Sequence, residues 1–127
     1  MNIQTVVKKN LKTEELNELI LDSILDIKGK KILKLDLRHL EDAAADFFVI
    51  CEGDSNTQVK AIADNICKRL KQEAGSLPFH FEGQRNAMWI CLDYFDTVVH
   101  VFYKETRAFY QLEELWSDAI FTEYQTL

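Results

Sequence analysis

The feature that most constrains the fold is a short, uninterrupted run of apolar residues at positions 47–51, Phe-Phe-Val-Ile-Cys. A strand with one face in water alternates apolar and polar residues, whereas a strand buried on both faces reads as a continuous apolar run. We therefore expect residues 47–51 to form a central strand of a sheet. The segments on either side of this run supply candidates for its neighbours.

Helical periodicity flanks the apolar run. Apolar residues recur at helical spacing over residues 13–28 and again over residues 55–74, where Ser55 begins a capping-box pattern. Between these two helices, residues 32–38 alternate apolar and charged side chains, which predicts a strand with one buried face. Residues 39–46 are expected to form a connector, in which three successive alanines could make a helical turn.

The second half of the chain changes to strand periodicity. Residues 77–82, 88–94 and 97–103 each alternate apolar side chains with other residues, and short turns separate them. Pro78 marks the first of these strands as an edge strand or as a strand that starts there, because proline cannot donate to a sheet ladder. The pattern predicts an antiparallel meander, after which residues 109–119 return to the spacing of a short amphipathic helix.

This order of elements predicts an α/β (α+β) fold in which helices cover a mixed sheet of about five strands. A chain of 127 residues is long enough for one domain and too short for two sizeable cores. We expect a single domain over residues 13–119, a flexible N-terminal segment at 1–12 and a loose C-terminal tail at 120–127. Within the meander we expect a core set, which comprises Met88, Ile90, Leu92, Val99 and Val101.

The cysteines and the apolar segments indicate the compartment. Cys51, Cys67 and Cys91 are an odd number at spacings that fit neither a disulfide framework nor a zinc site. We interpret them as reduced, buried thiols, which favours a cytoplasmic location. The N-terminal residues contain no long apolar stretch, and no segment reaches membrane-spanning length, so no membrane association is expected.

The net charge of −6 is unevenly distributed. Residues 1–71 contain 12 Lys and Arg against 12 Asp and Glu, whereas residues 72–127 contain three basic residues against nine acidic ones. A nucleic-acid surface needs Lys and Arg for phosphate contacts, so the second half is expected to make little direct nucleic-acid contact. The excess of acid instead favours a basic partner.

The strand-to-helix turn at Gly53, Asp54 and Ser55 is a candidate phosphate site, because helix N-terminal amides bind anions. A Gly-Ser pair occurs at such a turn in nucleotidyltransferases, which also need paired carboxylates to hold magnesium. The P-loop signature is missing, and Asp54 adds a negative charge at the turn. Helix capping by Ser55 is therefore the favoured interpretation, by about four to one on capping preferences.

Other candidate catalytic groups have simpler explanations. Asp93 and Asp96 could be a metal-binding pair, but acids at turn ends are common for hydrogen-bonding reasons. His100 lies in mid-strand among valines, where a core or sheet-face histidine is the default. No histidine is adjacent to Cys51 or Cys91, so a thiol nucleophile is not expected. We predict neither catalysis nor a cofactor or metal.

A single core of this size does not readily accommodate all four of the large aromatic residues Trp89, Tyr103, Tyr110 and Trp116. Tyr and Trp combine apolar area with a polar group and are enriched in protein interfaces as well as in cores. Core and interface are about equally favoured on this amphipathic character.

An ordered set of segments resembles the ribosomal silencing factors, the Iojap-like family, over roughly residues 13–119. The segments are Asp46-Phe47-Phe48-Val49-Ile50, Gly53-x-Ser55-Asn56, Val59-Lys60-Ala61-Ile62-Ala63-Asp64, Glu82-Gly83, Trp89-Ile90-x-Leu92-Asp93-Tyr94, Asp96-x-Val98-Val99-His100-Val101-Phe102 and Glu105-Thr106-Arg107-x-Phe109-Tyr110-x-Leu112-Glu113-x-Leu115-Trp116-x-Asp118-Ala119. No single segment is decisive, but the ordered set is specific.

The resemblance implies a nucleotidyltransferase-like fold without nucleotidyltransferase catalysis. It also implies binding to the large ribosomal subunit through its fourteenth ribosomal protein. Such binding would sterically block joining of the small subunit and repress translation when nutrients are limiting. Large-subunit maturation and homodimer formation are further properties that the resemblance implies.

The residues expected to contact the partner are Trp89, Asp93, Asp96, His100 and Tyr103, because they match family positions and lie on the predicted meander. Two positions depart from the family pattern. Phe95 stands where glycine is usual, which implies a differently shaped turn. Asp54 stands where Thr or Asn is common, which weakens a phosphate-binding role further.

Three hypotheses follow. The favoured one is a non-enzymatic ribosomal silencing factor, with a large-subunit assembly factor as a related alternative. A nucleotide-binding protein of nucleotidyltransferase fold is the second, and it requires Gly53 and Ser55 to lie near two carboxylates. A structural homodimer that uses the aromatic face only for self-association is the third.

Overall fold

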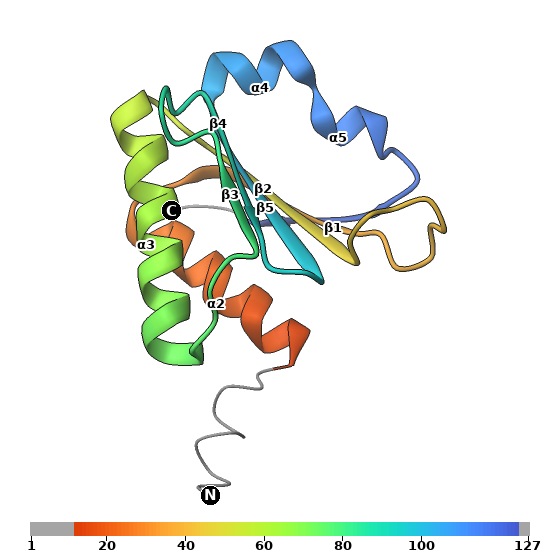
Figure 1. The fold of residues 1–127 in the computed structure, drawn as a ribbon. Helices are drawn as coiled ribbons and strands as arrows, with labels where there is room; N and C mark the ends of the chain where they lie inside the picture. The colour runs from red at the N-terminus through yellow and green to blue at the C-terminus, as the bar shows by residue number, and fades with distance from the viewer. Residues whose placement is uncertain (1–11, 125–127) are drawn as a thin grey trace, which may run out of the picture.

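The computed structural model describes residues 12–124, which form one mixed sheet with helices on both of its faces (Figure 1). The elements are α2 (Thr13–Asp26), β1 (Lys30–Asp36), β2 (Phe47–Gly53), α3 (Asn56–Ala74), β3 (His80–Glu82), β4 (Trp89–Asp93), β5 (Thr97–Tyr103), α4 (Lys104–Tyr110), α5 (Leu112–Leu115) and β6 (Ile120–Tyr124). The predicted flexible segment 1–12 lies outside the described residues except for Lys12.

The strands lie in the order β3-β4-β5-β2-β1-β6. β2 pairs in parallel with β5, and every other neighbouring pair is antiparallel. All seven residues of β2 are buried, so the prediction of a central strand at the apolar run is confirmed. The predicted meander is confirmed as β3-β4-β5, and the strand that follows Pro78 lies at the edge of the sheet.

The prediction for the C-terminal tail is wrong at residues 120–124, because Ile120–Tyr124 forms the sixth strand of the sheet. β6 pairs with β1 in continuous register, from Ile32 opposite Tyr124 to Asp36 opposite Ile120. Four of its five residues are exposed, so backbone pairing rather than side-chain burial holds it in place. Residues 125–127 lie outside the described part of the chain.

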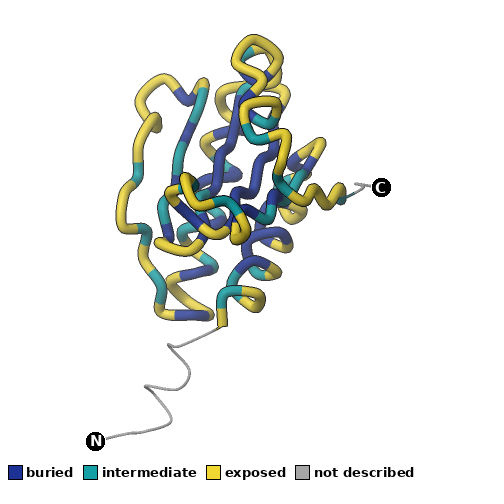
Figure 2. Tube along the Cα trace, turned by 90° about the vertical axis from the view of Figure 1, so that its right-hand side faces the viewer, coloured by how far each residue is buried: buried dark blue, intermediate teal, exposed yellow. Residues whose placement is uncertain are grey.

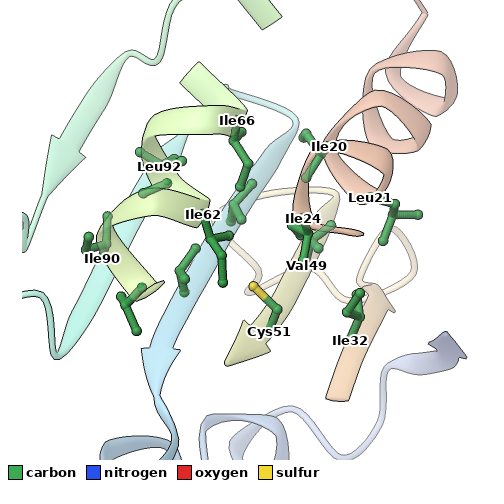
Figure 3. Packing of buried hydrophobic residues seen from close by; sticks show 14 of the residues in the cluster. Ile20, Leu21, Ile24, Ile32, Val49, Cys51, Ile62, Ile66, Ile90 and Leu92 are labelled. Carbon is green, nitrogen blue, oxygen red and sulfur yellow. The ribbon is translucent and has the colours of Figure 1, made fainter. Parts of the chain in front are cut away.

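One face of the sheet is covered by α2 and α3. Apolar side chains of both helices point onto the strands, including Ile20 and Ile24 of α2 and Ile62 and Ile66 of α3 (Figure 3). Ser55 caps α3 by accepting a hydrogen bond from the Gln58 backbone amide, so the predicted cap is confirmed. None of the helices in the described range 12–124 is long and apolar enough to cross a membrane.

The opposite face carries a second, smaller core. It is closed by the connector that follows β1 and by the segment after β5, and its buried members are Leu35, Leu37, Ala45, Phe48, Ile50, Phe102 and Leu112. The connector makes turns and bends in place of the helical turn expected at its alanines. Figure 2 views the molecule from a quarter turn to Figure 1 and shows the buried central strands among exposed connecting segments.

The predicted amphipathic helix over residues 109–119 is replaced by two short helices. α4 begins directly after β5, and Gln111 separates it from α5 by adopting a left-handed conformation with φ of 49°. Leu112 is buried, but Phe109 and Leu115 are 80% and 75% exposed. The helical spacing of these residues therefore does not mark one buried stripe.

Candidate partner-binding site

The five predicted contact residues lie along the β4-β5 hairpin but do not form one surface. Trp89 pairs with Phe102 at one end of the hairpin, and Asp93 pairs with Val98 at the other. Four residues of extended chain separate these ends, a distance of roughly 13 Å. The end with Trp89 lies beside α4, and the opposite end is the turn between β4 and β5 (Figure 1).

The end beside α4 carries an exposed aromatic hollow, which we call the Trp89 patch and define as Met88, Trp89, Tyr103, Phe109 and Tyr110. These residues line one open hollow together with Asn86, Glu105 and Thr106. Met88, Phe109 and Tyr110 are 47%, 80% and 53% exposed. Glu105 is the only charged side chain in the lining, so the hollow is apolar with a slight acidic character.

Stacked rings support the Trp89 patch from below. The Trp89 indole stacks on buried Phe102 with ring centroids 4.8 Å apart, and its centroid lies 5.1 Å from that of Tyr110. The Tyr110 ring in turn meets Phe109 edge-on at 5.1 Å. Partner-binding hot spots are typically aromatic side chains held on a packed base, and the patch has this arrangement.

Sequence reasoning assigned Met88 to the core, and this prediction is wrong because β4 begins one residue later, at Trp89. Ile90, Leu92, Val99 and Val101 are fully buried, so the rest of that core set is confirmed. Phe109 and Tyr110 were not predicted as site residues. The signal for them was available, because two adjacent aromatic residues on a short helix cannot both face the core.

His100 lies beneath the surface and not on it, with 7% of its area exposed. Its Nδ1 accepts a hydrogen bond from the Trp89 indole Nε1–H at 3.1 Å. Because an indole nitrogen can only donate, His100 Nδ1 must be unprotonated and the ring neutral. Burial lowers the pKa of His100 to about 4, which keeps it neutral at physiological pH. His100 therefore positions Trp89 and is too buried to contact a partner directly.

The cysteines show no sign of a nucleophile. Cys91 Sγ lies 3.5 Å from His100 Nδ1, but burial raises the pKa of this thiol to about 11. Burial also raises the pKa of Cys51 to about 12. Both groups are thiols rather than reactive thiolates at neutral pH. All three cysteines are free, but only Cys51 is buried, so the prediction of buried thiols is wrong for the partly exposed Cys67 and Cys91.

Asp93 and Asp96 shape the turn at the other end of the hairpin. Asp93 Oδ1 accepts a hydrogen bond from the Phe95 amide at 2.9 Å, and Asp96 Oδ2 accepts one from the Thr13 hydroxyl at 2.9 Å. Within residues 12–124 no group of three or more His, Cys, Asp or Glu side chains is placed to hold a metal ion. The turn interpretation of these two acids accounts for their contacts.

The turn before α3 is occupied by its own hydrogen bonds. The Asp54 amide donates to Gln58 Oε1 at 2.7 Å, while the Gln58 amide donates to Ser55 Oγ at 3.1 Å. The Asp54 carboxylate forms an ion pair with Lys30 at 2.6 Å. Two amides of this turn, those of Asp54 and Gln58, are thus used in capping contacts, and this supports capping over nucleotide binding.

Comparison with known proteins gives a consistent result. The family model described as "Ribosomal silencing factor during starvation" matches residues 10–127. The chain is 40% identical to a ribosomal silencing factor RsfS of Halalkalibacterium halodurans, over 86% of this chain and 92% of that protein. It is 44% identical to the RsfS of Bacillus subtilis, over 74% of this chain and 78% of that protein.

A eukaryotic relative and a solved structure extend the comparison. "Mitochondrial assembly of ribosomal large subunit protein 1" of Mus musculus is 35% identical over 57% of this chain and 32% of its own length. A crystal structure of a Chromobacterium violaceum protein superposes with a TM-score of 0.80 at 36% identity. The match covers 84% of this chain and 88% of that one.

Proposed function

Because this chain belongs to the family of ribosomal silencing factors, we propose that it binds the large ribosomal subunit through the Trp89 patch. Bound there, it would block joining of the small subunit sterically and repress translation under nutrient limitation. The proposed contact on the ribosome is the fourteenth protein of the large subunit. Family membership supports the ribosome-associated silencing role, and the partner protein and the blocking mechanism are our proposals.

The observation that carries the choice of surface is an exposed aromatic hollow on a rigid base. Trp89 is held in place by stacking on Phe102 and by its hydrogen bond to His100. A side chain ordered before binding loses little conformational entropy when a partner covers it. The Trp89 patch thus combines apolar area with preorganisation, as energetically dominant interface residues do.

Charge supports a basic protein as the partner. Glu105 lines the hollow, and Arg107, one of only three basic residues after position 71, is buried and paired with Glu52 and Glu113. A surface of this composition attracts a basic protein and repels the phosphates of bare RNA. Binding should therefore depend on a ribosomal protein more than on direct RNA contact.

The test is co-sedimentation with purified large subunits, combined with an assay of subunit joining. Trp89→Ala should weaken binding by about 30-fold, the effect of removing an interface hot spot worth about 2 kcal/mol. Phe109→Ala should weaken it at least about five-fold without loss of stability, because this ring is 80% exposed.

Phe121→Ala on β6 is the matched control, since it removes another exposed phenylalanine at a distance from the hollow. Equal binding by Phe109→Ala and Phe121→Ala would remove the Trp89 patch from the proposal. Binding by all variants at the wild-type level, with subunit joining still blocked, would move the contact to another face.

A role in large-subunit assembly is a second candidate, supported by the name of the mouse relative. Cells that lack the factor should then accumulate incomplete large subunits even in rich medium, a result that silencing alone does not produce.

The outer edge of β6 pairs with no other strand of the described chain, which supports homodimer formation as a further proposal. A cytoplasmic location is proposed from the reduced thiols expected of such a compartment.

A further inference from the structure

A second exposed apolar cluster lies at the opposite end of the hairpin from the Trp89 patch. We call it the Phe95 patch and define it as Phe79 and Phe95, which are 60% and 68% exposed. The rings of Phe79 and Phe95 contact each other with centroids 4.6 Å apart, and His80 meets Phe79 edge-on at 4.9 Å. Large apolar side chains grouped in this way commonly mark an interaction surface.

The backbone at Phe95 is held in an unfavourable conformation. Its φ of 73° lies in the left-handed region, where a side chain meets the backbone and glycine does not. Phe95 gains little in return through burial, because its ring contacts mainly another exposed ring. The backbone conformation and the exposure of Phe95 therefore favour a role outside the fold, such as contact with another molecule.

Acidic groups flank the Phe95 patch. Asp93 and Asp96 lie on either side of the turn, and neither forms an ion pair with another described residue. Asp93 uses one carboxylate oxygen for the Phe95 amide, and His80 faces Asp93 across the β3-β4 pair. Apolar rings beside two unpaired carboxylates match a partner surface that presents an apolar side chain next to Lys or Arg.

We propose that the Phe95 patch is a second contact point for a basic protein surface of the large ribosomal subunit, in addition to the Trp89 patch. This inference rests on the proposed function. Two separated contacts on one rigid hairpin would fix the orientation of the protein on the subunit, which a single patch does less well.

The test compares Phe95→Gly with the wild-type protein in binding to purified large subunits and in urea unfolding. The variant should unfold at an equal or higher urea concentration, since glycine accepts the left-handed backbone. Its affinity for large subunits should nevertheless fall by about five- to ten-fold, since the ring is a contact. Asp93→Asn keeps the oxygen that accepts the Phe95 amide and removes the charge, so it should reduce the salt dependence of binding.

The outcomes separate the two proposals. Wild-type affinity in Phe95→Gly, with Trp89→Ala still weakened, would overturn the second contact and leave the Trp89 patch intact. A change only in self-association of Phe95→Gly, with unchanged affinity for large subunits, would assign the patch to a second copy and also overturn the inference. If the wild-type protein does not bind large subunits, both proposals fall together.

Discussion

His100 is buried, but it positions Trp89, a residue of the exposed Trp89 patch. Its Nδ1 fixes the indole of Trp89 through one hydrogen bond, and its ring lies edge-on against Phe48 with centroids 4.7 Å apart. The other ring nitrogen, Nε2, is buried without a hydrogen-bond partner among the described residues. The ring can accept the hydrogen bond from the Trp89 indole only while it is neutral. If Nδ1 were protonated, two N–H donors would face each other.

Acid should destabilise the fold through His100. Burial lowers its folded-state pKa to about 4, while the unfolded chain titrates near the ordinary value of 6.5. As pH falls below 6.5 the unfolded chain binds a proton first, so stability is fully present above that pH and is lost as pH drops toward 4. Between about pH 7.5 and pH 5, His100 should lower the free energy of unfolding by about 2 kcal/mol.

Urea unfolding at the two pH values measures this effect, and His100→Gln is the comparison. The variant should start from a lower stability, because it loses the stacking of the ring, but its stability should change less with pH. Parallel pH dependence in both proteins would assign acid sensitivity to the carboxylates alone.

At the scale of the elements, Arg107 joins parts of the chain that local sequence does not connect. Its Nη1 donates to the Lys31 carbonyl of β1 at 2.6 Å and to Glu52 Oε1 of β2 at 3.2 Å, and its Nε donates to Glu113 Oε1 of α5 at 3.2 Å. The side chain is 8% exposed. α4, which carries part of the Trp89 patch, is thus anchored to the sheet by a buried ion-pair network.

Arg107→Met should therefore destabilise the protein by about 3–5 kcal/mol, since it leaves Glu52 buried and unpaired. The measurement is the free energy of urea unfolding. Adding Glu52→Gln should restore part of the loss, because the uncompensated charge is then removed. Lys30→Met, which breaks the exposed pair with Asp54, is the control and should differ little from wild type. An equal effect of the two single variants would argue against a buried anchor.

Elements that bury a regular stripe could be predicted from the sequence, and those fixed by long-range contacts could not. β2 is a continuous apolar run because it is buried on both faces, and β5 and α3 carry clear periodicity because each packs an apolar face against a core. β6 has no such face, and its pairing with β1 joins opposite ends of the chain. Likewise, no local pattern indicates that Gln111 interrupts the helix while Arg107 turns inward.

The candidate site shows the same division. Alternation along the hairpin correctly separated core residues such as Ile90 and Val99 from the other face. It did not show that Trp89 and Asp93 lie at opposite ends of that face, or that the rings of Phe48 and Trp89 pack against His100. Periodicity indicates on which face of a strand a residue lies. The solvent exposure of that residue depends on which other segments pack against the face.

At the scale of the whole molecule, α2 and α3 cover one face of the sheet (Figure 1). Each proposed contact patch is built on one end of the β4-β5 hairpin, the Trp89 patch with residues of α4 and the Phe95 patch with Phe79. The two patches lie at opposite ends of β4 and β5, so a partner that contacts both must span the hairpin. This arrangement leaves the outer edge of β6, on the far side of the sheet order, available for other contacts.

Removal of residues 120–127 should destabilise the molecule and promote aggregation. The deletion uncovers the outer edge of β1, whose backbone groups pair with β6, and it removes the partly buried Tyr124 that packs against the core. Size-exclusion chromatography and urea unfolding measure both effects. Deletion of residues 125–127 alone leaves β6 intact and serves as the control. A monomeric product of wild-type stability from the longer deletion would show that β6 contributes little.

The pairing of β1 with β6 also constrains the order in which the sheet can form during synthesis. A chain grows from its N-terminus at roughly 5–20 residues per second, so several seconds separate synthesis of β1 from synthesis of its outer neighbour. During that interval the nascent sheet has an open edge next to β1, which other growing chains could join. This edge is closed only after residues 120–124 have emerged, so the pairing of β6 follows synthesis of every other strand of the sheet.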